Sequence, residues 1–244
     1  MNNLLKISFS FFVFSLAGLA NLTFASGALT PVTPVTPVIP VTPASQNTPA
    51  SLLTQYLNQI NQFSADVTES LITDSGESVK NVGHVWIQKP GKFRYEIHNP
   101  EVQTFVSDGK NLYNYEPDLM QVIVRPLDQS ISQTPLLLLS GSGEDLAKLF
   151  KITEIAGATG DLPDEKVQAF LLIPLDQEGL INQVVLTFRV KNIANTENIL
   201  ESLKVSNSFG QTTVLYFSHI VQNQAAPLDK FIFTVPQGVD VLGG

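Results

Sequence analysis

Histidine and acidic side chains are the groups in this sequence that could carry acid–base or metal chemistry. The histidines are His84, His98 and His219. None has a partner at a metal-binding spacing such as H-x-x-x-H, and we expect all three on strands or at strand edges. The adjacent carboxylates, Glu144-Asp145 and Asp164-Glu165, fall in loops or at helix starts, where they favour the helix dipole or solvent.

Motifs of nucleophilic, phosphate-binding and dinucleotide-binding sites are missing from the sequence. It contains no G-x-S-x-G, no G-x-x-x-x-G-K-S/T and no G-x-G-x-x-G string. The spacing of the acidic residues places no pair of carboxylates across a cleft, as glycoside hydrolysis requires. We therefore predict no catalytic residues, no metal ligands and no cofactor, and a protein that is not an enzyme.

Four consecutive leucines, Leu136–Leu139, stand between Pro135 and Gly141, and we call them the leucine segment. A helix this short can turn only part of its surface toward a core, so four adjacent leucines imply apolar contact on nearly all sides. A helix held between a sheet and a bound acyl chain meets that condition. The other apolar loading, with 15 Phe, 5 Tyr and Trp86, is explained by a β-sheet core alone.

The composition is that of an acidic chain with enough apolar residues for a sizeable core. Its 244 residues include 14 Lys+Arg and 22 Asp+Glu, which gives a formal net charge of −8, and 43% of them are hydrophobic. These values argue against wholesale disorder and against a nucleic-acid partner, because phosphate contacts need clustered Lys and Arg. The lack of cysteine excludes disulfides, thiolate metal sites, a cysteine nucleophile and a lipid-modified N-terminal cysteine.

Residues 1–25 have the pattern of a secretory signal peptide. One lysine precedes an apolar run from Ile7 to Leu19, and small residues follow up to Ala25. The alternative, an uncleaved anchor helix, needs about 20 apolar residues, and this run is shorter. We expect cleavage after Ala25, or else after Ala20, and export to the periplasm.

Residues 26–47 form a linker rich in Pro, Thr and Val. Proline recurs at every third position from Pro31 to Pro43, which favours an extended polyproline II chain that does not pack. A spacer is the preferred interpretation, and a ligand for a proline-binding groove is the alternative. The folded domain is predicted over residues 48–244.

Hydrophobic periodicity predicts one helix followed by many strands. The helix begins with Thr48 as its cap and Pro49 as its first residue, and its apolar spacing continues to Phe63. Leu146, Leu149 and Phe150 predict a further short helical stretch. The predicted strands are Ala65–Leu71, Gly83–Gln88, Phe93–His98, Thr104–Ser107, Asn111–Tyr115, Gln121–Val124, Val167–Ile173, Ile181–Val190, Leu200–Ser206, Thr213–Ser218 and Lys230–Val235.

The fold class that follows is mainly β with a few helices (α+β). Closely spaced strands with tight turns indicate an antiparallel meander, and a sheet of so many strands must curl. Such a sheet has one concave face, and strand alternation turns Phe93, Tyr95 and Ile97 to the apolar side. If the sheet closes only partly, that face needs a cover, for which the leucine segment is the candidate.

Several strings together resemble the LolA family, the periplasmic carriers that take lipoproteins from the inner to the outer membrane. They occur in family order and cover residues 48–242. The strings are Leu52–Phe63 with Phe63-Ser64-Ala65-Asp66-Val67, the block Gly83–Tyr95, Val106-Ser107-Asp108-Gly109-Lys110-Asn111-Leu112-Tyr113-Asn114-Tyr115-Glu116-Pro117, Thr134–Leu139, and the closing Phe231–Val241.

The resemblance implies an incomplete antiparallel β-barrel, or half-barrel, with a helical lid over an apolar cavity for acyl chains. By position it assigns Trp86, Phe93, Tyr95 and the leucine segment to the cavity or lid. Where family members have an arginine that latches the lid, this sequence has Lys89 before Pro90. The lysine ammonium is a point charge, whereas the arginine guanidinium is planar and donates several hydrogen bonds, so we expect a weaker or reorganised latch.

The resemblance also implies the partners of a carrier. These are the acyl chains of lipoproteins, an ATP-dependent inner-membrane exporter that loads the carrier, and an outer-membrane receptor that unloads it. The family's receptor is itself a lipoprotein, and a chain without cysteine fits the carrier, acting as a monomer. An anchor with several acyl chains cannot cross the aqueous periplasm exposed to water, because burying each CH₂ is favourable by about 0.8 kcal/mol.

Three alternative functions are a regulatory domain, a carrier of another lipid and an enzyme. A regulatory domain on the same half-barrel would sense stray lipid or lipoprotein for a signalling partner, and a carrier of another amphipathic lipid would use the same cavity. An enzyme on this scaffold is disfavoured because the sequence offers no acid–base pair.

Overall fold

The computed structural model describes residues 48–127, 135–158, 166–176, 179–192 and 197–243. The signal-peptide and linker predictions, residues 1–25 and 26–47, lie outside these ranges, as does Asp164-Glu165. The described residues belong to one compact unit, Ser45–Gly244. None of the helices in these ranges has both the length and the apolar character needed to span a membrane.

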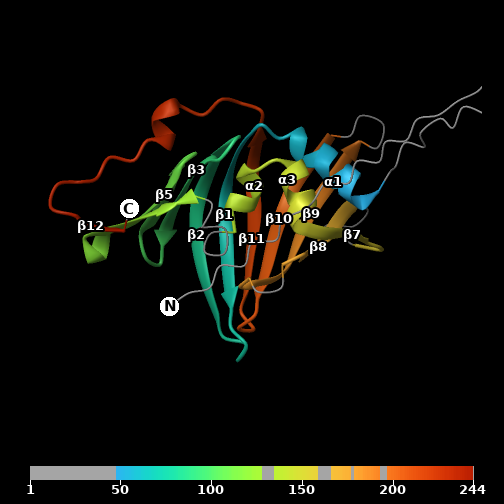
Figure 1. The fold of residues 1–244 in the computed structure, drawn as a ribbon, viewed down its shortest axis with the longest axis horizontal. Coiled ribbons are helices and arrows are strands. Elements are labelled where there is room, and N and C mark those ends of the chain that lie inside the picture. The colour runs from blue at the N-terminus through green and yellow to red at the C-terminus, as the bar shows by residue number, and fades with distance from the viewer. Residues whose placement is uncertain (1–47, 128–134, 159–165, 177–178, 193–196, 244) are drawn as a thin grey trace, which may run out of the picture. The chain divides into compact units, whose positions relative to one another are not determined.

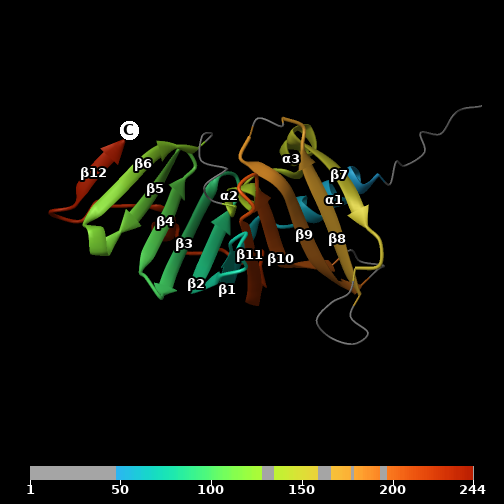
Figure 2. The ribbon, with the colours of Figure 1, turned by 90° about the horizontal axis from the view of Figure 1, so that it is seen from below.

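One twelve-stranded sheet dominates this unit, with the strand order β12-β6-β5-β4-β3-β2-β1-β11-β10-β9-β8-β7, which Figure 2 follows from one edge to the other. All neighbours are antiparallel except β12, which runs parallel to β6. The strands are β1 (Gln62–Ile72), β2 (Ser78–Gln88), β3 (Lys92–Asn99), β4 (Gln103–Asp108), β5 (Asn111–Glu116), β6 (Gln121–Pro126), β7 (Phe150–Ile155), β8 (Val167–Pro174), β9 (Ile181–Asn192), β10 (Glu197–Asn207), β11 (Thr212–Gln222) and β12 (Asp240–Gly243). In the described part of the chain β12 and β7 are the edges, so the sheet is open and the incomplete barrel is confirmed.

Three α-helices lie on one face of this sheet (Figure 1). They are α1 (Pro49–Asn58), α2 (Leu137–Ser140) and α3 (Gly143–Leu149), and the short 3₁₀ helices are η1 (Pro117–Leu119) and η3 (Leu228–Phe231). α1 begins as predicted, because Thr48 Oγ1 accepts the Ser51 N–H at 3.2 Å. It ends at Asn58, before Phe63, which is already part of β1.

Strand alternation gives the sheet an inner and an outer face. Cross-strand partners such as Ile87 and Phe93 point inward, and their neighbours Trp86 and Arg94 point outward. The helices cover the inner face and complete a single large apolar core with it. The segment after β11 lies on the outer face, where Phe233 stacks on Tyr113 of β5 with ring centroids 5.3 Å apart.

Besides the early end of α1, two further secondary-structure predictions are wrong. Phe150 begins strand β7 and does not continue the helix of Leu146. The predicted strand Lys230–Val235 is instead the end of η3 followed by a chain that pairs with no strand in the described residues. Its apolar alternation comes from packing on the outer face, which demands the same period as a ladder. Every other predicted strand lies within an observed one.

Candidate functional site

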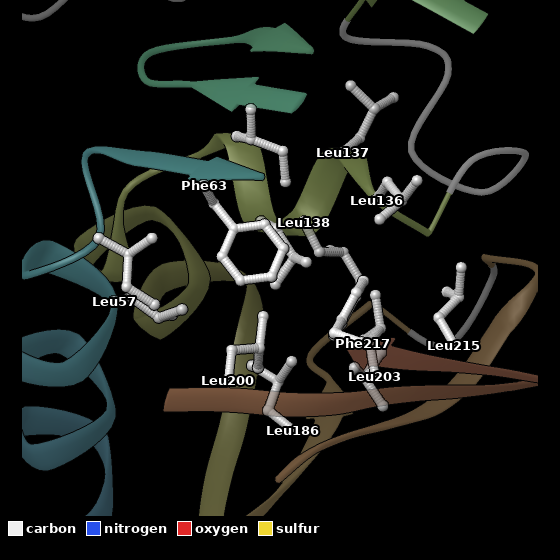
Figure 3. Packing of buried hydrophobic residues seen from close by; sticks show 14 of the residues in the cluster. Leu57, Phe63, Leu136, Leu137, Leu138, Leu186, Leu200, Leu203, Leu215 and Phe217 are labelled. Atoms are coloured by element: carbon white, nitrogen blue, oxygen red, sulfur yellow. The ribbon is translucent and has the colours of Figure 1, made fainter. Parts of the chain in front are cut away.

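The leucine segment lies on the inner face of the sheet, where α2 comprises Leu137 to Ser140 and Leu136 precedes it. The four leucines are only 1%, 6%, 3% and 4% exposed, so the expected apolar contact on nearly all sides is present. Figure 3 shows Leu138 beside the ring of Phe63 of β1, and Leu136 and Phe217 of β11 belong to the same apolar cluster. The segment therefore covers part of the inner face with apolar side chains.

A single backbone hydrogen bond in the described residues ties α2 to the turn between β2 and β3. The Gly91 N–H donates to the Ser140 carbonyl at 2.9 Å. The Gly91 carbonyl in turn accepts from Ser107 Oγ at 2.6 Å, and Ser107 is fully buried. Gly91 has φ +72°, and a Cβ there would lie 3.3 Å from the Gly109 Cα, so this turn requires glycine. The leucine segment is thus held mainly by apolar contact.

Phe93 and Tyr95 join the leucines in the same apolar cluster, as the resemblance implies. Both lie on the inner face of β3, with 0% and 3% of their surface exposed. The Tyr95 hydroxyl donates to Glu69 Oε2 at 3.2 Å. Burial, followed by the charge of Glu69, raises the pKa of Tyr95, so the hydroxyl stays protonated and remains a donor.

Trp86 is not brought to this cluster. It follows the inward Val85 in β2, and the alternation of the strand turns it to the outer face. Its ring lies 4.2 Å from that of His84, and Lys230 Nζ sits 3.9 Å from the indole centroid. The expected place of Trp86 at the cavity is therefore corrected by the structure, which gives it a cation–π contact with the segment after β11.

Lys89 binds the end of α1 and not the leucine segment. Its Nζ donates to the Leu57 carbonyl at 2.7 Å, where a cation also complements the helix dipole. Burial lowers the pKa of Lys89 to about 8, although the charge of Glu144 on α3 acts in the opposite direction. Among the described contacts, the bond that holds α2 comes from Gly91, two residues after the predicted latch.

The buried amine predicts a pH-dependent stability. Since the folded pKa of about 8 is below the ordinary 10.5, the unfolded chain binds more protons between these values, and the free energy of unfolding rises with pH there. The gain is up to about 3 kcal/mol. Urea unfolding from pH 8 to 10 should show this rise in the wild type and in Lys148→Met, an exposed control. Lys89→Arg should lack it, and an unchanged rise would contradict the burial cost.

A hydrogen-bonded chain on the outer face joins residues that the sequence showed as unrelated. His84 Nε2 lies 2.8 Å from Ser64 Oγ, and His84 Nδ1 lies 2.6 Å from Asp66 Oδ1. His219, which has φ +50° at an irregularity in β11, places Nδ1 2.8 Å from Asp66 Oδ2. Hydrogen bonds from His84 and then His219 lower the pKa of Asp66. Cross-strand pairing creates this cluster, so no spacing along the chain could reveal it.

The hydrogen-bonded residues Ser64, His84 and Asp66 have the order of a Ser–His–Asp triad, but in the described part of the chain no oxyanion site adjoins the serine. Ser64 is paired on both sides, with Trp86 of β2 and Val221 of β11, so its backbone is committed to the sheet and offers no oxyanion site. Within the described ranges, no group of three His, Cys, Asp or Glu residues is placed to hold a metal ion. The cluster stabilises the Asp66 carboxylate and the junction of β1, β2 and β11.

A cavity of about 130 Å³ adjoins the start of the leucine segment. Its apolar wall includes Phe105, Leu136 and Leu215, and its polar wall includes Glu69, Asn81 and Gln103. A cavity of this size holds a molecule such as benzene, which is much smaller than an acyl chain. Over the described residues, the buried leucine segment occupies the part of the inner face next to this cavity.

Comparison with known proteins agrees with this arrangement. The family model described as "Outer membrane lipoprotein carrier protein LolA" matches residues 58–234. The chain belongs to the LolA family. It is 35% identical over 199 residues to the outer-membrane lipoprotein carrier protein of Chromohalobacter salexigens, covering 81% of this chain and 88% of that protein. It is 32% identical over 191 residues to the protein of the same name from Pseudomonas fluorescens, covering 78% and 86%.

Among solved structures, a LolA superfamily protein from Nitrosomonas europaea aligns with a TM-score of 0.44 and 13% identity, covering 76% of this chain and 98% of that one. The LolA match includes most of the sheet, the leucine segment, Lys89 and the 130 Å³ cavity. Most of α1 and the whole of β12 lie outside the matched residues.

Proposed function

We propose that this LolA family member carries lipid-modified proteins through the periplasm, with their acyl chains on the inner face of the sheet. The observation that carries the proposal is the burial of all four leucines against that face by a four-residue helix. An empty apolar face of this size would promote aggregation, and the leucine segment covers it until cargo arrives. The names of its relatives, outer-membrane lipoprotein carrier proteins, favour a carrier over a sensor domain.

The energetics of exchange fit acyl cargo. Exposing four leucine side chains costs about 6–12 kcal/mol, at roughly 1.5–3 kcal/mol each. An acyl chain of about 15 methylenes contributes about 12 kcal/mol at 0.8 kcal/mol per CH₂. One chain therefore at least offsets the displacement of the leucine segment, with a surplus of up to about 6 kcal/mol. Each further chain of the same anchor adds its full contribution, so a singly acylated molecule is expected to bind more weakly than a triacylated one.

The proposal includes export through the signal peptide at residues 1–25 and cleavage after Ala25. It also includes loading by an ATP-dependent inner-membrane exporter, unloading to an outer-membrane receptor, and action as a monomer without catalysis. Phe93, Tyr95 and the leucine segment are the proposed acyl contacts. Trp86 is not included, because it points away from them.

Cargo binding tests the proposal directly. Purified protein is mixed with a triacylated lipopeptide, the corresponding monoacylated peptide or the unmodified peptide, and soluble complexes are detected by native mass spectrometry. We expect a 1:1 complex with the triacylated species, at least tenfold weaker binding of the monoacylated one and none of the unmodified one. Depletion of the protein in its host should make lipoproteins collect in the inner membrane. Failure of the triacylated species to bind would overturn the proposal.

A further inference from the structure

The cavity beside Leu136 has two chemically different walls. Leu136, Phe105 and Leu215 form an apolar wall that is continuous with the core of the inner face. Glu69 lies opposite on β1, beside its cross-strand partner Asn81. The cavity therefore brings together an apolar wall that is continuous with the core and a polar wall.

The Glu69 carboxylate uses only some of its hydrogen-bond acceptor positions within the described residues. Its Oε2 accepts from Asn81 Nδ2 at 3.0 Å and from the Tyr95 hydroxyl at 3.2 Å. A carboxylate has about four acceptor positions, and these are the two that the described hydrogen bonds occupy. None of the ion pairs among the described residues includes Glu69. A half-buried negative charge thus lines the cavity with neutral donors as its partners.

Gln103 adds a second acceptor to the same wall. Both hydrogens of its Nε2 are directed to β5, to Asn114 Oδ1 at 3.0 Å and to Glu116 Oε1 at 3.1 Å. The group that Gln103 has left for the cavity is its carbonyl oxygen. The Glu69 carboxylate and the Gln103 carbonyl oxygen are both acceptors, and Glu69 is negatively charged. They would repel a phosphate or a carboxylate, whereas they can accept hydrogen bonds from an N–H group.

We propose that this cavity binds the nitrogen at which an acyl chain joins its polar cargo, an amide N–H or an ammonium group, with Glu69 as the principal acceptor. This subsite rests on the proposed carrier function, and it specifies which part of the cargo the carrier recognises. The acyl chain runs from the subsite along the inner face beneath the displaced leucine segment. Two sources offer this chemistry, an N-acylated polypeptide and the amine of a phospholipid such as phosphatidylethanolamine.

The test compares ligands that differ at one hydrogen. Calorimetric titration measures Kd for a triacylated lipopeptide with an N–H amide and for its N-methylated analogue, which keeps every acyl carbon. The wild type should bind the N–H form about tenfold or more tightly. Glu69→Gln keeps the size and accepts more weakly, so the preference should fall to a few-fold. Glu69→Leu should remove it. Glu77→Gln, a matched change at an exposed residue between β1 and β2, should keep it.

A second comparison identifies the source. Binding of phosphatidylethanolamine over phosphatidylglycerol, lost in Glu69→Leu, supports the subsite and assigns it to a lipid amine, whereas preference for the lipopeptide assigns it to an acylated polypeptide. Equal affinity of the N–H and N-methyl forms, with tight binding of both, overturns the subsite and leaves the carrier function intact. Absence of binding by every acylated ligand overturns the carrier function itself.

Discussion

Replacing Leu138 by aspartate is expected to displace the leucine segment and to reduce lipoprotein transfer at least tenfold. Leu138 is 3% exposed and lies within the apolar cluster, so a carboxylate there would be buried without a partner. That burial costs several kcal/mol, whereas a four-residue helix tied by one backbone hydrogen bond can swing outward to hydrate the charge. Acyl chains packing beneath the segment would then meet a carboxylate.

The lack of cysteine makes displacement of the segment measurable. A single Leu137→Cys reports it by thiol labelling, since Leu137 is only 6% exposed. In the Leu138→Asp background labelling should accelerate a hundredfold or more, because about 3 kcal/mol corresponds to that factor. Leu138→Met, which conserves volume, should label and transfer nearly as the wild type does. Wild-type transfer by Leu138→Asp would show that the segment has no part in cargo binding.

Local patterns were sufficient to predict most of the sheet. Alternation in Phe93-Arg94-Tyr95 determines which side chains face the core, and the structure buries Phe93 and Tyr95 as predicted. The burial of the leucine segment was equally predictable, because four adjacent leucines on a single helical turn need apolar contacts on all sides. In both cases the burial of neighbouring residues is set by the residues themselves.

Features that depend on how distant strands meet were not predictable. The Asp66 cluster requires the register that places His84 beside Asp66 and the irregularity that turns His219 toward it. Glu69 became a cavity residue only because Tyr95 and Leu136, which are 26 and 67 positions away along the chain, line the same cavity. Trp86 was misplaced for a different reason, because the resemblance assigned it by position, whereas it alternates with the inward Val85 and Ile87 in β2.

The firm attachment of α1 contrasts with the loose attachment of α2. Tyr56 of α1 meets Phe188 of β9 and Phe170 of β8 edge-on, with ring centroids 5.3 Å and 5.8 Å apart. Both phenylalanines are fully buried. Removing one of these rings leaves a cavity that the paired strands cannot close.

Phe188→Ala is therefore expected to lower the free energy of unfolding by about 3–5 kcal/mol, measured by urea denaturation. Phe209→Ala is the matched control, since Phe209 is 67% exposed and its loss should change stability by no more than about 0.5 kcal/mol. Under native conditions the Phe188 variant should leave thiol labelling at Leu137→Cys unchanged, because the ring anchors α1 and not α2. Equal acceleration by Phe188→Ala and Leu138→Asp would mean that both helices open together. Labelling that responds to Leu138 alone would assign opening to α2, with α1 and the sheet as its fixed frame.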